Sequence, residues 1–276
     1  MAFRKITKLN ALLIISLFCF AQSQTSAFAN SKNSPSHKLV KPISIPFIEA
    51  QPIIDGTFSE DEWSQAKLIK LDFITRPFET LPAPVKTQVR VFESGADLYV
   101  LFVANDPNPD NIRAYLRDRD TGFDNDLVGI KIDPYNDGRL AYQFYSNPLG
   151  VQTDSIENEM TGSESVSWNG IWQSAGTITS SGFVVEMKIP LRLLNFEKSD
   201  GIKEWGVEFV RFYPRGEEYR LSHVQFDPNN SCNLCQMGRA TGFANAKQVN
   251  NLAVVPTMVV GKARSRDLDG SEIWTD

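Results

Sequence analysis

Residues 85–104 read VKTQVRVFESGADLYVLFVA, and polar and apolar side chains alternate in the first half of this stretch. The valines there fall on one face and Arg90 on the other, which is the period of two expected for a strand with one buried face. The run Leu98–Ala104 is apolar, and Ser94–Asp97 contains a Gly that suits a tight turn. The stretch therefore predicts a β-hairpin.

The same alternation recurs along the chain, whereas helical signals are few. Further strands are predicted at Leu127–Ile132, Leu140–Ser146, Phe183–Ile189 and Trp205–Phe209. Ser59, with Glu62 three residues later, is a possible capping box for one short helix to Ala66, and Pro190–Leu194 suits another helical turn. We therefore predict an all-β fold, a two-sheet antiparallel β-sandwich of immunoglobulin or jelly-roll type with one or two short helical turns.

The N-terminus has the pattern of an export signal. Arg4, Lys5 and Lys8 precede the apolar run Ala11–Ala21, which is too short to span a bilayer comfortably. Ala27-Phe28-Ala29 places small residues at the −3 and −1 positions of a cleavage site. We expect a signal peptide at 1–29, with a membrane anchor as the alternative, and export to the periplasm or outer membrane of a Gram-negative bacterium.

The remaining chain divides by composition. Residues 30–42 are rich in Ser, Asn, Pro and Lys, which predicts a disordered linker. The predicted sandwich occupies 43–245. Residues 246–276 are expected to form a terminal strand, at 251–260, and a polar tail.

Composition and motifs exclude several function classes. The net charge is −5 with no basic cluster, which argues against a nucleic-acid partner. Neither GxSxG nor HExxH occurs, and of the two histidines only His223 lies in the predicted fold. We therefore predict that the chain is not an enzyme.

Two of the three cysteines remain after export. Cys232 and Cys235 form a CxxC pair without the His that covalent haem attachment uses and without a second pair for zinc. In an oxidising compartment this favours a Cys232–Cys235 disulfide over free thiols.

The stretch IIDGTFSEDEW, Ile53–Trp63, resembles the opening motif of family 9 carbohydrate-binding modules, in which Asp-Gly turns the chain and Trp63 enters the core. The resemblance continues over roughly residues 45–245, through Asp97–Val100, Asn105–Pro107, Arg117–Asp120, Asp126–Gly138, Tyr142–Phe144, Asn147–Gly150, Trp168, Trp172, Val185–Pro190 and Trp205–Arg211.

This resemblance implies a non-catalytic carbohydrate-binding module of an exported protein, linked to polysaccharide binding or catabolism. The motifs are most similar to a subgroup in which the sandwich precedes an outer-membrane β-barrel, so that the strand at 251–260 would be the start of a truncated barrel. The alternative is that this strand closes the sandwich or has another use. One alternative is a scaffold or plug domain of an outer-membrane protein with no small ligand. Another is a b-type haem domain, with His223 and Met160, Met187 or Met237 as ligands, but no spacing favours haem and none is expected.

Sugar recognition needs flat apolar faces and short polar arms. Trp168 and Trp172 lie in or beside a Ser/Asn/Gly-rich stretch that is typical of an exposed loop. We take these two residues, with Arg117 and Tyr135, as candidate contacts to a glycan or oligosaccharide.

An acidic run offers oxygen ligands for calcium, which related modules carry. Its members are Asp118, Asp120, Asp124 and Asp126. Their spacing is not that of an EF-hand. The alternative is pairing with the neighbouring Arg113, Arg117 and Arg119.

Overall fold

The structure is a computed structural model that describes residues 41–77, 81–248, Pro256 and Met258, together with the backbone of two short strands near the C-terminus. The predicted signal peptide, the predicted linker up to residue 40 and, apart from Pro256 and Met258, the strand predicted at 251–260 lie outside these residues. Among the described residues, no helix has the length and apolar character needed to cross a bilayer.

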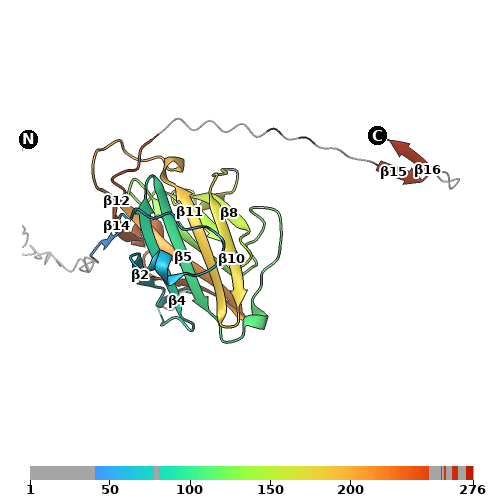
Figure 1. The fold of residues 1–276 in the computed structure, drawn as a ribbon, viewed down its shortest axis with the longest axis horizontal. Coiled ribbons are helices and arrows are strands. Elements are labelled where there is room, and N and C mark those ends of the chain that lie inside the picture. The colour runs from blue at the N-terminus through green and yellow to red at the C-terminus, as the bar shows by residue number, and fades with distance from the viewer. Residues whose placement is uncertain are drawn as a thin grey trace, which may run out of the picture. The chain divides into compact units, whose positions relative to one another are not determined.

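Two β-sheets form a sandwich, which confirms the predicted fold class; the five-stranded sheet faces the viewer in Figure 1. Its strand order is β10-β11-β5-β4-β2, with bounds Gln173–Thr179, Gly182–Pro190, Asp97–Asn105, Thr87–Ser94 and Lys67–Lys70. The predicted hairpin at 85–104 is the β4–β5 pair.

The second sheet has nine strands, ordered β1-β14-β12-β6-β7-β8-β9, with β13 paired to β12 and β3 paired to β13. Their bounds are Ile43–Ser44, Gly238–Gly242, Lys203–Arg215, Leu127–Asp133, Leu140–Ser146, Gln152–Asn158, Ser163–Ser165, Glu217–Ser222 and Phe73–Arg76. All pairings within the sandwich sheets are antiparallel except β1 with β14. Separately, β15 (Ala263–Arg266) and β16 (Glu272–Thr275) form an antiparallel hairpin.

The main core lies between the two sheets and follows the alternation in the sequence. Every second side chain of a strand points inward, as the pleat requires. The inward residues include Val89 and Val91 of β4, Val100 and Phe102 of β5, Val185 and Met187 of β11, Val128 and Ile130 of β6, and Val207 and Phe209 of β12.

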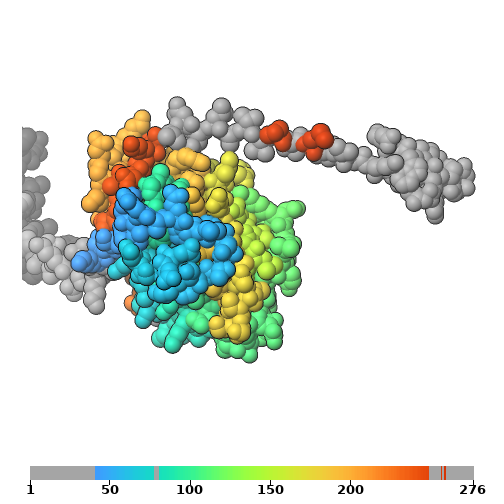
Figure 2. Space-filling model, in the orientation of Figure 1, coloured from blue at the N-terminus to red at the C-terminus, as the bar shows by residue number. Residues whose placement is uncertain are grey.

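A smaller core lies on the outer face of the five-stranded sheet, where the N-terminal segment (blue in Figure 2) crosses it. Trp63 is fully buried there against Phe92, Tyr99 and Leu101, so its predicted core position is confirmed. The helix is shorter than expected: α1 spans only Glu60–Trp63, and the Ser59 side chain makes no capping hydrogen bond, so the predicted capping box is wrong.

The other helical elements are single 3-10 turns, η1 (Pro109–Asn111), η2 (Leu191–Leu193) and η3 (Leu234–Gln236). η2 confirms the turn predicted after Pro190. η3 lies in a loop that the predicted disulfide closes: the structure joins Cys232 to Cys235, whose Cα atoms are 5.4 Å apart.

Candidate functional site

The loop of residues 112–126, which leads from η1 into β6, presents an aromatic ring to solvent. Tyr115 is 53% exposed, but its backbone is held on both sides. Its amide donates to Asn125 Oδ1 at 2.8 Å, and its carbonyl accepts from Asn147 Nδ2 at 2.9 Å. Both asparagines are buried, so the exposed ring stands on a fixed support.

The predicted contact Arg117 lies beside this ring. Its guanidinium carbon is 5.3 Å from the centroid of Tyr115. The same group donates to both oxygens of Asp124, at 2.8 and 2.9 Å, in the two-bond geometry that carboxylates and guanidinium groups prefer. The guanidinium thus lies over the partly exposed ring and is itself paired with an acceptor. An aromatic ring with polar groups beside it is the combination that a sugar ring with its hydroxyls requires.

Arg119 connects this loop to the segment that carries Trp168. It donates to Asp154 Oδ1 on β8, through Nε at 2.7 Å and also through Nη2, and to the carbonyl of Gly170 at 2.7 Å. Trp168 is half-buried, with its ring edge-on to Tyr142 at 5.0 Å between centroids. Arg119 therefore links the 112–126 loop, which carries Arg117, to the segment that carries Trp168.

Two of the predicted contacts do not join them. Trp172 is only 5% exposed and packs in the core, 5.6 Å from the ring of Phe144, so it offers no face to a ligand and that expectation is corrected. Tyr135 is 53% exposed, but it follows β6, whereas the 112–126 loop precedes it. A seven-residue strand is roughly 20 Å long, which places Tyr135 at the far end of β6 from the 112–126 loop. It is closer in the sheet to Tyr142, the ring neighbour of Trp168, because Tyr142 pairs with Ile132.

A model of the carbohydrate family 9 binding domain-like family matches residues 54–227. The chain belongs to this family. The matched range contains Tyr115, Arg117, Arg119, Asp154 and Trp168, so the whole candidate site lies inside the family 9 domain.

Solved structures with the same fold are distant in sequence. A family 9 module from Caldicellulosiruptor kristjanssonii, solved with cellotriose and separately with glucose, is 16% identical with a TM-score of 0.51 in both cases. The match covers 79% of this chain and 100% of the cellotriose-bound chain, and 77% and 99% for the glucose-bound one. A protein from Bacteroides uniformis ATCC 8492 is 12% identical, with a TM-score of 0.58 and coverage of 73% and 98%. No curated protein matches the chain.

The acidic run of the family 9 domain is not gathered into a metal site. Asp124 pairs with Arg117, and Asp120 Oδ1 accepts the amide of Asp154 at 2.9 Å. Asp118 points to solvent, and Asp126 is buried. Across the described residues, no three His, Cys, Asp or Glu side chains are placed to hold a metal ion. These residues do not fit the calcium site considered above.

Asp126 belongs instead to a buried charge cluster. Its carboxylate accepts from Arg215 at 2.9 and 3.1 Å and from the backbone amide of Arg113 at 2.8 Å. Burial raises the pKa of Asp126 above its usual value, while Arg215 and the Arg113 amide oppose that shift. Of the arginines expected to pair with the acidic run, Arg113 contributes through its backbone.

The residues considered for haem do not fit an axial ligand pair. His223 Nδ1 accepts the amide of Phe209 at 3.3 Å, and burial lowers the pKa of His223 to about 4. A Cβ on Gly238 would lie 2.8 Å from His223 Nε2, so residue 238 approaches that nitrogen closely. Met187 and Met237 are buried, whereas Met160 is 76% exposed.

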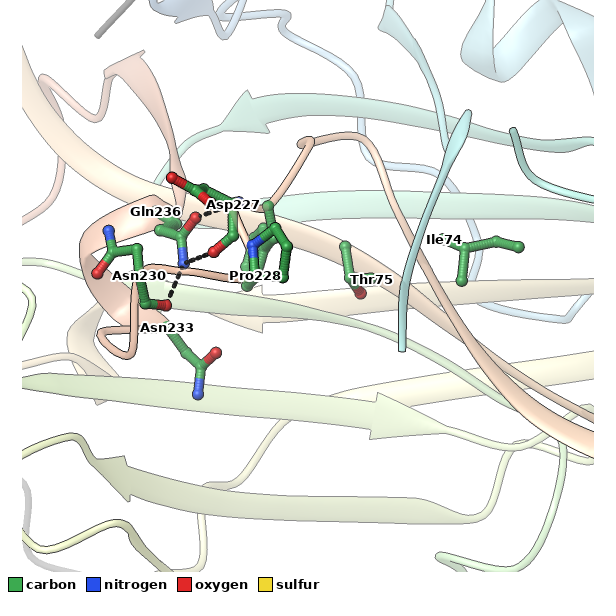
Figure 3. Close-up of a pocket in the computed structure, with 8 residues that line it drawn as sticks. Ile74, Thr75, Asp227, Pro228, Asn230, Asn233 and Gln236 are labelled. Atoms are coloured by element: carbon green, nitrogen blue, oxygen red, sulfur yellow. Dashed lines mark hydrogen bonds between the residues drawn. The ribbon is translucent and has the colours of Figure 1, made fainter. Parts of the chain in front are cut away.

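Figure 3 shows a pocket lined partly by residues next to the disulfide, where Gln236 accepts the amide of Asp227 at 2.6 Å and donates to the carbonyl of Asn230 at 3.0 Å. Its volume is about 10 Å³, room for roughly one water molecule. The residues that line it are Ile74, Thr75, Phe226, Asp227, Pro228, Asn230, Asn233 and Gln236. In this form it is too small for a sugar ring.

A larger hollow of about 250 Å³ lies beside α1. None of the described residues that line it is aromatic; they are Ile48, Ala50, Gln51, Pro52, Asp61, Glu62, Ser64 and Gln65. Trp63, the nearest aromatic residue in the sequence, is fully buried. The hollow therefore lacks the stacking face that the Tyr115 loop has.

Proposed function

We propose that this family 9 domain binds oligosaccharides, without converting them, through a surface formed by Tyr115, Arg117 and Trp168. The observation that carries the proposal is the exposed ring of Tyr115, whose backbone is held by Asn125 and Asn147 and whose ring contacts Arg117 of the Arg117–Asp124 pair. A loop whose backbone is already held loses little conformational freedom on binding, so more of the contact energy appears as affinity.

The chemistry of this surface suits neutral polyols. The Tyr115 ring can stack on the CH-rich face of a sugar, and the outer edges of Arg117 and Asp124 can donate to and accept from hydroxyl groups. Hydroxyl hydrogen bonds are largely an exchange with water, so modest affinity is expected. The presence of cellotriose in a structure of similar fold supports cello-oligosaccharides as the first probes.

Titration calorimetry with cellotriose tests the proposal on three matched variants. Tyr115→Ala and Trp168→Ala should each weaken binding, and an aromatic contact of about 0.5–1.5 kcal/mol corresponds to roughly a twofold to tenfold loss. Phe47→Ala is the control, because Phe47 is similarly exposed but lies beside Glu93 of β4, on the other sheet. Chromatography of the incubated sugar should show no product.

Two results would count against this function. If Phe47→Ala weakens binding as much as Tyr115→Ala, the site lies elsewhere on the sandwich. If no oligosaccharide in a broad panel binds, the scaffold or plug role in an outer-membrane protein replaces carbohydrate binding.

We also propose that the domain is exported and belongs to the subgroup whose sandwich precedes an outer-membrane β-barrel. The charged start, the apolar run and the Ala27-Phe28-Ala29 site support export, and the order of motifs supports the subgroup. N-terminal sequencing of protein from a Gram-negative host should begin near Asn30. Met1 retained on soluble protein would contradict export.

A further inference from the structure

Arg119 contacts three separate parts of the chain. It belongs to the 112–126 loop, it donates to Asp154 and Gln152 of β8, and it donates to the carbonyl of Gly170 beyond β9. Through this one guanidinium group, the loop that carries Tyr115 is hydrogen-bonded to the segment that carries Trp168.

Both backbone polar groups of Gly170 are hydrogen-bonded. Arg119 Nη2 bonds its carbonyl at 2.7 Å, and Asp154 Oδ2 accepts its amide at 2.6 Å, so the Arg119–Asp154 pair holds both backbone polar groups of one residue. The position is sterically tight, because a Cβ on Gly170 would lie 3.0 Å from Cη2 of Trp168. A shift of Gly170 would therefore displace the Trp168 ring.

The loop is attached to the same strand a second time. The amide of Asp120 donates to the carbonyl of Gln152 at 3.1 Å, and Asp120 Oδ1 accepts the amide of Asp154. Asp120 has a φ of +65°, a left-handed conformation that costs a non-glycine residue energy. This arrangement persists because the contacts of Arg119 and Asp120 along β8 hold it.

The hydrogen bonds of the Arg119–Asp154 pair depend on the planar shape of the guanidinium group. Asp154 is fully buried, and burial raises the pKa of its carboxyl while the Gly170 amide and Arg119 oppose that shift. A lysine at position 119 would keep a positive charge near this carboxylate. It would lack the planar fork that reaches Asp154, Gln152 and Gly170 at once.

We propose that Arg119, acting with Asp154, is the positioning residue that holds the Tyr115 loop and the Trp168 segment together as a single binding surface. The inference rests on the proposed carbohydrate function for its ligand, but the coupling between the two segments is a property of the protein alone.

Hydrogen exchange of the unliganded protein tests the coupling. Arg119→Lys should speed exchange in both 112–126 and 163–172, including the amides of Tyr115 and Gly170. The matched control is Arg90→Lys, because Arg90 bonds Glu60 at 3.0 Å through both nitrogens and the carbonyl of Trp63 at 3.0 Å, on the other sheet. It should change neither segment. Arg119→Ala gives a second variant if lysine preserves the contacts.

Faster exchange in one segment only, or in neither with both Arg119 variants, would overturn the proposal. A titration with cellotriose gives the functional readout. In the wild-type background, the effects of Tyr115→Ala and Trp168→Ala on the dissociation constant should be coupled. In the Arg119→Lys background, the fold-change of the double variant should equal the product of the two single fold-changes. Independent effects already in the wild type would also overturn it. If the wild type binds no oligosaccharide, the carbohydrate function is refuted. The hydrogen-exchange result then still tests whether Arg119 couples the two segments.

Discussion

Glu186 joins the opening motif of the family to the five-stranded sheet, and its removal gives the sharpest stability test. The side chain is fully buried on β11 and accepts three hydrogen bonds: from the amides of Asp55 and Gly56 at 3.0 and 2.9 Å, and from Trp63 Nε1 at 3.1 Å. One oxygen serves both amides and the other serves the indole. All three donors would face a poorer acceptor in Glu186→Gln.

The magnitude follows from this geometry. A glutamine can accept from the two amides or from Trp63, but its NH₂ then faces an N–H donor, and an unpaired buried donor costs about 1–3 kcal/mol. For a domain of this size, a loss of about 2 kcal/mol lowers the melting temperature by roughly 4–8 °C. Trp63→Phe removes the indole N–H and should lose a similar amount. Trp63→Ala should cost about 3–5 kcal/mol or more, because it also leaves a cavity.

Equilibrium urea unfolding of the two single variants and the double variant measures the coupling. Burial raises the pKa of Glu186, so the experiment is made at pH 8 to favour the carboxylate. Because phenylalanine has no N–H to oppose the glutamine amide, Glu186→Gln should cost clearly less in the Trp63→Phe background than alone. Additive effects, or a Trp63→Ala variant as stable as Trp63→Phe, would refute this account of the motif.

Three further outcomes are expected. The melting temperature should be the same with and without EDTA, since the Asp118–Asp126 carboxylates are not gathered around one point; a clear fall on chelation would restore calcium. His223 has a folded-state pKa of about 4, below the unfolded value, so its contribution to stability is complete above about pH 6.5 and is lost as pH falls towards 4, by up to roughly 3 kcal/mol. The difference in unfolding free energy between wild type and His223→Asn should therefore shrink over that range, and a constant difference would contradict this. Alkylation of folded exported protein without reductant should leave Cys232 and Cys235 unmodified, and intact mass that shows two additions would exclude the disulfide.

The strands that the sequence predicted correctly all have an apolar face. β4, β5, β6, β7, β11 and β12 contribute to the core between the sheets, and either alternation or, as in β5, a continuous apolar run is visible in a short window of residues. β8 was missed because Gln152–Asn158 is polar on both faces. Its outward side chains Ser155 and Glu157 are buried all the same, and Glu157 accepts from Gln143 at 2.7 Å and pairs with Lys131. A strand stabilised by polar neighbours on other strands leaves no periodic pattern of its own.

For the candidate site, the sequence indicated the charged loop and the region of Trp168. It could not distinguish aromatic residues that are exposed to a ligand from those that are buried in the core. Trp172 resembles Trp168 in its local sequence and is nevertheless core, while Tyr115 was overlooked. A short signal for Tyr115 existed, an aromatic residue two positions before Arg117 in a loop rich in charge.

Periodicity and composition are local properties, so the sequence alone was enough for the all-β class, most core strands and the disulfide. The buried position of Trp63 came from the resemblance of its motif to family 9 modules. Exposure and pairing depend on partners far along the chain. Asn147 holds Tyr115 across 32 residues, and Asp154 meets Arg119 across 35. These contacts exist only once the strands have assembled, because only then do a loop before β6, a strand after it and a segment beyond β9 lie within hydrogen-bond distance of one another.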